Sequence, residues 1–283
     1  MGKIKSYIIA KSIGLYLNLL SYVQPEKASL LAYRFFTEPR TGRLVKDKLP
    51  PVLKDSFGET LNHKDTDFQT YVWPGNEKVI LLVHGWESNA SRWENMLPYL
   101  QKTGCTIVAI DAPAHGLSSG TEFNLVMYAE IIDAAARKFK PQFLIGHSVG
   151  AASCIYYQYK YQNPHIRKIV SLGAPSDLKV IFRNYVSLLS LNTRMSALME
   201  QYFIDRFRFK IEDFSARVFG SALKTRGIIA HDVADEVVAF DEAKKIAGSW
   251  KNAVFIETEG LGHSLHDDKL YRRVSDFLFD AED

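Results

Sequence analysis

The sequence has few of the residues that mark disulfide scaffolds, metal centres or nucleic-acid-binding surfaces. Only two of its 283 residues are cysteines, Cys105 and Cys154, and both lie in apolar stretches. No Cys or His spacing typical of a metal site occurs, so neither a disulfide framework nor a metal cluster is expected, and a reducing, cytoplasmic location is favoured. Basic and acidic residues number 35 and 32, and the net charge of +3 gives no general case for a nucleic-acid partner.

Long hydrophobic runs are also missing. The uncharged run of the apolar N-terminal stretch, residues 12–23, is too short to span a bilayer, which takes about 20 residues. Lys11 interrupts the apolar stretch upstream and no small-residue cleavage site follows, so a signal peptide is not expected. Residues 1–48 nevertheless carry nine Lys and Arg against three Asp and Glu. Apolar residues recur within this segment at Ile4, Ile8, Leu15 and Leu19.

Two alternatives remain open for this N-terminal segment. A helix with a regular apolar repeat packs on the rest of its domain in most proteins. A basic helix of this kind also suits docking on an anionic membrane surface, with Lys3, Lys5 and Lys11 near the apolar residues. The sequence thus predicts an N-terminal helical extension, with packing on the domain and peripheral membrane contact as the two alternatives for it.

From residue 78 onward, apolar runs alternate with stretches of helical spacing. Strands that are apolar on both faces and separated by helices indicate a parallel sheet covered on both sides. Helices are predicted at 90–101, at 124–139, and after the run at 143–145 up to about Tyr161. Two more alternating stretches, near 58–62 and 68–73, are expected to be antiparallel edge strands, which makes eight strands in all. The buried strands are predicted at 79–83, 105–110, 143–145, 169–172, 227–230 and 253–257.

One interval breaks this alternation. More than fifty residues separate the strands at 169–172 and 227–230, too many for a simple crossover. Helices are predicted there at 180–189, 195–207 and 211–218, so the interval is interpreted as an inserted helical cap. The predicted organisation is a helical extension (1–50), an α/β core (51–175 and 223–283) and a helical cap (176–222).

The sharpest motif is Gly-X-Ser-X-Gly at residues 146–150, with Ser148 at its centre. It follows a predicted strand and precedes a predicted helix, the context of a nucleophilic serine on a strand-to-helix turn. Such a turn strains the serine backbone, and only small residues two positions before and after it let strand and helix approach closely. The helix N-terminus behind the hydroxyl favours developing negative charge. Ser148 is therefore the predicted nucleophile.

A serine hydroxyl needs a base to accept its proton, and the expected base is a histidine after the last strand. His263 follows that strand in a glycine-flanked loop at 260–263. His266 is the strongest rival because it lies only three residues further along. Three other histidines are weaker candidates for the base. His84 lies at a strand end, His147 inside the motif and His115 in the loop after Asp111.

The acid that orients the base should follow a strand between nucleophile and base, in the chain order Ser, Asp, His. Asp235 lies after the strand at 227–230 and is the first choice, with Asp232 beside it as an alternative. Asp177 is a second alternative, although it can also cap the helix that begins near residue 180. A carboxylate oxygen of Asp235 is expected within about 3.2 Å of a ring nitrogen of His263, which is hydrogen-bond distance.

Stabilising an oxyanion requires two donors that are fixed before the reaction. The backbone N–H of Val149, directly after the nucleophile, is one candidate. The other is expected in the loop after the strand at 79–83, where Gly85 lets the backbone turn and Trp86 follows. The ring of Trp86 is equally suited to form a wall of a substrate pocket.

In order and spacing these segments resemble the α/β-hydrolase superfamily, with its serine esterases and lipases. The resemblance rests on residues 81–86 (Leu-Leu-Val-His-Gly-Trp), 111–118 (Asp-Ala-Pro-Ala-His-Gly-Leu-Ser), 146–150, 231–238 and 262–263, and it covers about residues 56–283. It implies an eight-stranded, mostly parallel sheet flanked by helices, with a helical cap inserted after the sixth strand.

Two departures from the family pattern are visible. Ala114 stands where the family often has Gly, and Ala239 where Pro often follows the valine after the acid. Neither position belongs to the predicted catalytic groups. Ser148 at the turn excludes the aspartate-nucleophile relatives, the haloalkane dehalogenases and epoxide hydrolases.

The resemblance implies a serine hydrolase that cleaves a carboxylic ester or related acyl bond, without a cofactor, on a small-molecule acyl substrate. Alternatives are thioesterase, carbon–carbon bond hydrolase, peptidase or acyltransferase chemistry, or a binding protein that keeps the fold without turnover. Apolar side chains of the predicted cap either line an acyl pocket or pack the cap: Phe182, Tyr185, Leu188, Leu189, Tyr202 and Phe203.

Overall fold

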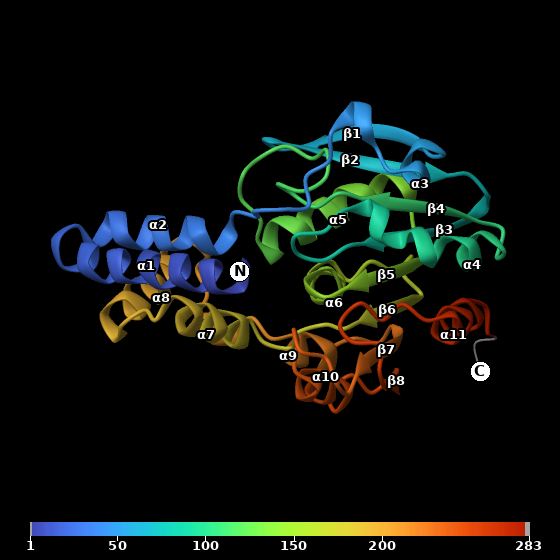
Figure 1. Ribbon diagram of the computed structural model, residues 1–283. Helices are drawn as coiled ribbons and strands as arrows, with labels where there is room; N and C mark the ends of the chain where they lie inside the picture. The colour runs from blue at the N-terminus through green and yellow to red at the C-terminus, as the bar shows by residue number, and fades with distance from the viewer. Residues whose placement is uncertain (1, 281–283) are drawn as a thin grey trace. The chain divides into compact units, whose positions relative to one another are not determined.

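The computed structural model describes residues 2–280, although the side chains of residues 2–4 and 6, including Ile4 of the predicted apolar repeat, lie outside that description (Figure 1). The chain divides into two compact units. The helical unit consists of the chain up to Glu38 together with Asp177–Ser215, and the α/β unit of Pro39–Ser176 together with the chain from Ala216 onward.

The α/β unit is built on one sheet of eight strands in the order β1-β2-β4-β3-β5-β6-β7-β8 (Figure 1). The strands from β4 to β8 in this order pair in parallel, and β2 is antiparallel to both β1 and β4. The strands are β1 (Phe57–His63), β2 (Thr66–Trp73), β3 (Asn76–Val83), β4 (Cys105–Ile110), β5 (Phe143–His147), β6 (Lys168–Leu172), β7 (Arg226–Asp232) and β8 (Ala253–Thr258).

The prediction that both N-terminal strands are edge strands is half right. β1 forms the edge and is largely exposed, whereas β2 is an inner strand between β1 and β4. The polar residues that gave β2 its alternating pattern, Gln69 and Thr70, are buried. Thr70 Oγ1 donates to the Glu59 carbonyl and Gln69 Nε2 to the Thr70 carbonyl, so local hydrogen bonds satisfy these polar groups inside the sheet.

Helices flank this sheet, and apolar side chains fill the space between the layers. The segment predicted as one helix at 90–101 is a 3-10 turn, Ala90–Asn95, followed by α4 (Leu97–Gln101), which has Pro98 in its first turn. Proline has no N–H to donate, so it is accepted at the start of a helix and not in its interior. The remaining helices of the unit are α3 (Pro51–Lys54), α5 (Leu125–Phe139), α6 (Val149–Tyr161), α9 (Ala216–Ser221), α10 (Phe240–Ala247) and α11 (Asp268–Phe279), with a 3-10 turn at Lys46–Lys48.

The helical unit contains α1 (Gly2–Val23), α2 (Pro25–Thr37), α7 (Leu178–Leu189), α8 (Thr193–Phe207) and a 3-10 turn at Ile211–Asp213. The N-terminal helices share one apolar core with the inserted helices, so the segments predicted as separate extension and cap form a single unit. The boundaries lie at 38, 177 and 215 instead of 50, 176 and 222. α9 belongs to the α/β unit, where the Phe219 ring packs on Tyr156 and Tyr159.

Most of the apolar residues predicted in the insertion form the interior of this unit. Phe182, Tyr185, Leu189 and Phe203 are buried in its core and Tyr202 packs against that core, while Leu188 is exposed. The structure therefore favours packing over an acyl pocket for these side chains.

Candidate active site

Ser148 lies on the turn between β5 and α6 with φ 55° and ψ −128°, a strained conformation for a residue with a Cβ. A Cβ on Gly146 would lie 2.5 Å from Ala151 Cα, and one on Gly150 would lie 2.3 Å from the His84 carbonyl oxygen. The backbone N–H of Ser148 donates to the Leu172 carbonyl at 2.8 Å. The two glycines thus allow the close approach that the motif predicts, and β6 holds the strained turn from the neighbouring strand.

His263 lies between Ser148 and Asp235. Its Nε2 lies 3.1 Å from Ser148 Oγ, and its Nδ1 lies 2.7 Å from Asp235 Oδ2. The carboxylate can accept a hydrogen bond only from a protonated Nδ1, which leaves Nε2 free to accept the hydroxyl proton. The Asp235–His263 distance falls within the 3.2 Å limit expected from the sequence.

Asp235 is held from the opposite side by its own loop. Its Oδ1 accepts the N–H groups of Val237 and Val238 at 2.8 and 2.9 Å, and its side chain has no exposed surface. His231, also fully buried, has its Nε2 3.2 Å from Asp235 Oδ2 and donates to the Val238 carbonyl at 2.8 Å. The carboxylate therefore has little freedom to rotate away from His263.

The two alternative acids lie elsewhere. Asp232 Oδ2 accepts the N–H of Leu261 at 2.8 Å and the hydroxyl of Thr258 at 2.9 Å, so it ties the loop after β7 to the loop that carries His263. Burial alone would raise the pKa of Asp232, but hydrogen bonds from the Leu261 and Ala234 backbone outweigh burial and lower that pKa. Asp177 belongs to the helical unit, at the N-cap position of α7.

The rival histidines have other partners. His266 Nδ1 pairs with the Tyr271 hydroxyl. His147 Nε2 donates to the backbone carbonyl of His263 at 2.8 Å, which anchors the loop of the predicted base to β5. Burial lowers the pKa of His147 well below its usual range, so this ring stays neutral. His115 Nε2 accepts the N–H of Glu87 at 3.0 Å.

His84 braces the loop that carries Trp86. Its Nδ1 donates to the Gly85 carbonyl at 2.7 Å, and its Nε2 accepts the N–H of Ala112 at 2.9 Å. Burial, with nearby His115 as a smaller cause, lowers the pKa of His84 to about 3. A neutral ring with one donor and one acceptor nitrogen matches both contacts.

The two oxyanion candidates flank Ser148. Val149 is the first residue of α6, where backbone N–H groups have no partner within the helix. A Cβ on Gly85 would lie 2.9 Å from Ser148 Cβ, so the turn that leads into Trp86 passes directly against Ser148. The Trp86 ring packs edge-on against His115 and Phe123. This packing restrains the indole.

His84, His147 and His231 are positioning residues that sequence reasoning did not assign. A signal for them existed, because each lies at or directly after the carboxyl end of a parallel strand, where open α/β folds gather their sites. Their burial and their partners depend on neighbouring loops, which one sequence does not reveal.

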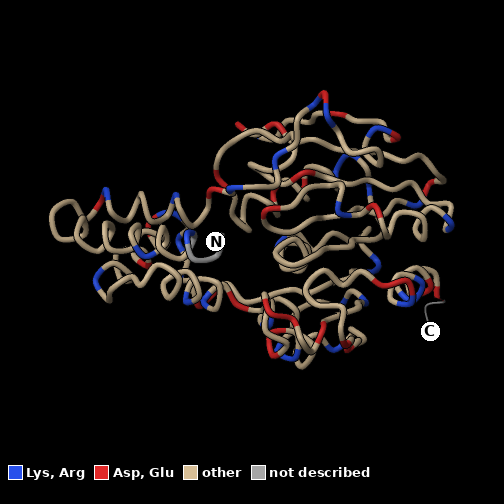
Figure 2. Tube along the Cα trace, in the orientation of Figure 1, with Lys and Arg blue, Asp and Glu red and all other residues tan. Residues whose placement is uncertain are grey.

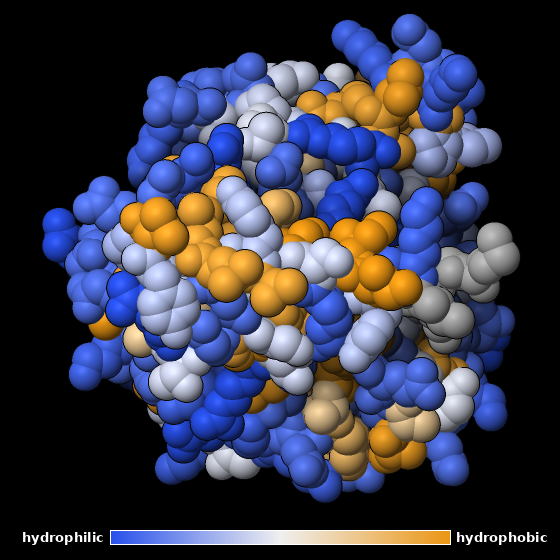
Figure 3. Space-filling view, turned by 60° about the vertical axis from the view of Figure 1, so that its left-hand side comes forward, coloured by the Kyte–Doolittle hydropathy of each residue, from blue (hydrophilic) through white to orange (hydrophobic). Residues whose placement is uncertain are grey.

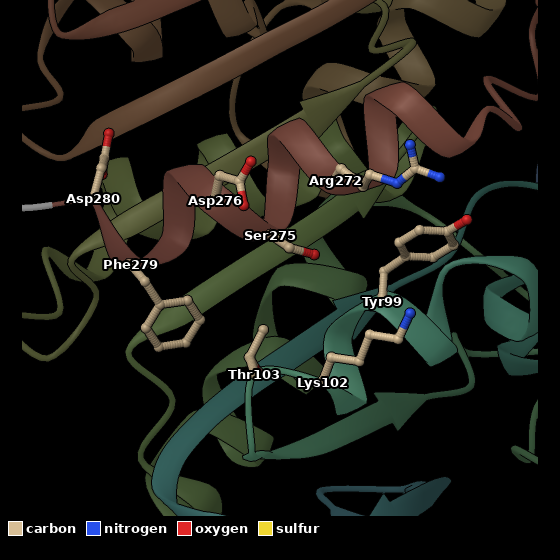
Figure 4. A pocket seen from close by; sticks show the side chains of 8 residues that line it. All are labelled: Tyr99, Lys102, Thr103, Arg272, Ser275, Asp276, Phe279 and Asp280. Atoms are coloured by element: carbon tan, nitrogen blue, oxygen red, sulfur yellow. The ribbon is translucent and has the colours of Figure 1, made fainter.

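An open pocket lies between α4 and α11, away from these residues (Figure 4). Several of the side chains around it are charged, and it contains none of Ser148, Asp235 and His263. Among the described residues, no group of three or more His, Cys, Asp or Glu is placed to hold a metal ion. The pocket is lined by Tyr99, Lys102, Thr103, Arg272, Ser275, Asp276, Phe279 and Asp280.

Parts of this sequence are similar to known proteins. Protein ABHD8 of Homo sapiens is 27% identical over 112 residues, which cover 37% of this chain and 25% of that protein. A serine hydrolase-like protein of Dictyostelium discoideum is 32% identical over 93 residues (30% and 26%), and phospholipase YtpA of Bacillus subtilis is 29% identical over 104 residues (34% and 40%). The matches thus span about a quarter of the length of the first two relatives.

Solved structures share the fold over most of the chain. Est1E of Butyrivibrio proteoclasticus, bound to ferulic acid, superposes with a TM-score of 0.65 at 16% identity, over 78% of this chain and 98% of that one. The thioesterase domain of the curacin biosynthetic pathway gives a TM-score of 0.57 at 16% identity, over 79% and 98%. The alpha/beta hydrolase fold family matches the sequence over residues 78–263, from β3 to His263. The chain therefore belongs to the alpha/beta hydrolase fold family.

Proposed function

We propose that the protein is a serine hydrolase that cleaves a carboxylic ester or related acyl bond through an acyl-serine intermediate. One observation carries this proposal: the chain of two hydrogen bonds from Ser148 Oγ through the His263 ring to Asp235, at 3.1 and 2.7 Å. A hydroxyl, a base and a buried carboxylate in this order can activate the hydroxyl as a nucleophile.

In the first half of the reaction, Ser148 Oγ attacks the carbonyl carbon while His263 Nε2 accepts the hydroxyl proton. Asp235 stabilises the imidazolium through Nδ1–H. The N–H groups of Val149 and Trp86 are proposed to donate to the oxyanion. The tetrahedral intermediate then collapses, the bond to the leaving group breaks, and the leaving group takes the proton from His263 Nε2.

In the second half, water attacks the acyl-serine and His263 accepts a proton from it. Collapse of the second intermediate releases the carboxylic acid and returns the proton to Ser148 Oγ. No cofactor enters this scheme. The relatives include a phospholipase and a serine hydrolase-like protein, which supports an acyl bond of an ester as the target.

Labelling with a fluorophosphonate probe tests the mechanism, because the probe reacts only with an activated serine. We expect labelling of the wild-type protein and none of Ser148→Ala. An unlabelled wild-type protein with no turnover of any acyl substrate would favour a binding protein on the same fold.

A substrate panel tests the bond that is cleaved. p-Nitrophenyl esters of graded chain length, an acyl thioester and a peptide amide should be compared by kcat/KM. The proposal predicts the highest value for an ester, and a higher value for the thioester or the amide would reassign the substrate class.

A further inference from the structure

The outward face of α1 is strongly apolar. Eight of the eighteen exposed large hydrophobic side chains among the described residues belong to this one helix, and each is between 50% and 77% exposed. Ile8, Leu15, Leu19 and Tyr22 follow one another at intervals of seven, four and three residues, which places them on a single face of the helix. The other four are Tyr7, Ile9, Tyr16 and Val23.

Two polar side chains of the same helix, Lys11 and Asn18, bind the end of α7 within the helical unit. Lys11 Nζ donates to the Ser187 carbonyl at 3.0 Å and to Ser190 Oγ at 2.8 Å, at the C-terminus of α7. Asn18 Nδ2 donates to the Ser190 carbonyl at 2.9 Å, and Asn18 Oδ1 accepts the N–H of Asn192 at 2.9 Å. These bonds fix the rotation of α1.

The packing of α1 against α7 is equally specific. A Cβ on Gly14 would lie 1.6 Å from the Leu189 carbonyl oxygen, so the two backbones touch at this glycine. Leu17 and Ser21 are fully buried on the same side. α1 therefore cannot turn its apolar stripe inward without losing both this contact and its polar anchors.

Figure 3 shows hydrophobic side chains gathered in a broad band on the face that it presents. Contiguous exposed apolar surface of this kind marks an interaction site. No helix among the residues described is long and apolar enough to cross a membrane. An amphipathic helix that does not cross the bilayer can lie in its surface, with its apolar side among the acyl chains.

Charge points to the nature of the partner. Lys5 of α1 is exposed, the helix has no acidic residue, and the chain up to Glu38 carries five basic residues against two acidic ones. In Figure 2 the charged residues of α1 are all basic and lie in the N-terminal half of the helix. Protein interfaces are depleted in lysine, whereas anionic lipids attract it, and tyrosine is enriched where apolar chains meet water. Tyr7, Tyr16 and Tyr22 supply such rings.

We propose that the outward face of α1 docks the protein on the surface of a membrane that contains anionic phospholipid. The helix lies along the surface, with Ile8, Leu15 and Leu19 among the acyl chains and Lys5 near the headgroups. This inference does not depend on the hydrolase chemistry proposed above.

Flotation of the full chain with vesicles tests the proposal. Vesicles of equal parts phosphatidylcholine and phosphatidylglycerol should carry the wild-type protein upward, and pure phosphatidylcholine vesicles should carry less. The triple variant Ile8→Gln, Leu15→Gln, Leu19→Gln should reduce vesicle binding by about tenfold or more, because three apolar side chains no longer leave water on docking. Lys5→Gln should weaken only the preference for the anionic vesicles.

A matched control carries three substitutions of exposed apolar residues outside α1: Val45→Gln, Phe57→Gln and Val254→Gln. It should bind vesicles like the wild type. Equal binding by the two triple variants, or no binding by the wild type, would overturn the proposal. So would a wild-type dimer in sedimentation that the α1 triple variant converts to a monomer without any vesicle binding, because the face would then join two copies of the chain.

A direct measurement covers the case in which the triple variant does not fold. Leu19→Trp changes one exposed residue and should show tryptophan quenching by brominated lipid beyond that of the wild type. Quenching no greater than that of the wild type, with the variant bound to the vesicles, would contradict insertion of this face.

Discussion

The two units use their polar side chains in opposite ways. In the α/β unit, buried polar groups meet at the carboxyl ends of the strands, where His84, His147, Asp232 and His231 hold the loops of Ser148, His263 and Asp235. In the helical unit, polar groups fasten α1 from within and leave its outer face apolar. In each unit, the hydrogen bonds hold the backbone in place around a group that is proposed to meet a partner. In the α/β unit this group is the Ser148 hydroxyl, and in the helical unit it is the apolar surface of α1.

The largest effect should come from Ser148→Ala. Removing the hydroxyl removes the proposed nucleophile, and turnover of an ester should fall by about 10⁵- to 10⁶-fold. The fold should persist because the backbone of the turn is held by the Leu172 carbonyl and the two glycines. Ester hydrolysis and circular dichroism would check both expectations. Turnover close to wild type, with contaminating esterase excluded by a second purification, would rule out the mechanism.

Asp235→Asn should follow in size. Its amide can no longer fix the protonated Nδ1 of His263 through charge, so turnover should fall by about 10⁴-fold. Asp232→Asn, at the end of β7 and three residues before Asp235, is the matched comparison. It loses acceptor capacity for Leu261 and Thr258, so it should lower the free energy of unfolding by about 1–3 kcal/mol and turnover far less than Asp235→Asn does. Equal losses of kcat in the two variants would contradict the assignment of Asp235.

The sequence alone could predict much of the α/β unit. Buried strands were found because they are apolar on both faces, and Ser148, His263 and Asp235 stood out because each follows a strand in the chain order of the family. Ala114 stands where the family often has Gly, and its backbone explains that preference. Its φ is 63°, a left-handed conformation that favours glycine.

Other features could not be predicted because they depend on contacts between distant segments. The N-terminal helices pack with helices more than 140 residues away, as in the Lys11–Ser187 and Asn18–Ser190 hydrogen bonds. The apolar residues of α7 and α8 gave no indication of whether they face a substrate or α1 and α2. β2 was predicted at an edge because its polar residues gave no sign that hydrogen bonds would satisfy them inside the sheet.

Gly14→Ala tests the contact between α1 and α7 in the helical unit. Its Cβ would collide with the Leu189 backbone, which is not a flexible side chain, so α1 and α7 must separate. We expect a loss of about 1–3 kcal/mol in the free energy of unfolding. Ser12→Ala, on the exposed face of the same helix, serves as control and should be neutral or slightly stabilising. Denaturant unfolding would measure both, and equal stabilities would show that the α1–α7 contact is looser than described.

Acid should lower the stability of the α/β unit through its histidines, because all eight histidines of the chain lie in that unit. The pKa of His84 is lowered to about 3 in the folded protein, so between about pH 6.5 and 3 the unfolded chain binds the extra proton. Stability should therefore fall as the pH drops through this window, with a contribution from His84 of up to about 1.4 kcal/mol per pH unit. His84→Gln should flatten this slope in urea titrations at several pH values. An unchanged slope would mean that His84 is not buried as a neutral ring.

The smallest effect is expected at His231, which touches Asp235 and not His263. In His231→Phe, the Val238 carbonyl loses its donor and Asp235 loses a polar neighbour at 3.2 Å, although the Val237 and Val238 N–H groups still hold Oδ1. The carboxylate should become less well positioned, and kcat should fall by about tenfold, equivalent to about 1.4 kcal/mol. KM should change little because His231 has no exposed surface. His231→Gln keeps a donor within reach of Val238 and should recover most of the loss. If His231→Phe kept the wild-type kcat, or if the glutamine variant lost as much activity at an unchanged melting temperature, then His231 would only fill space in the core and the loop of Asp235 would position the acid alone.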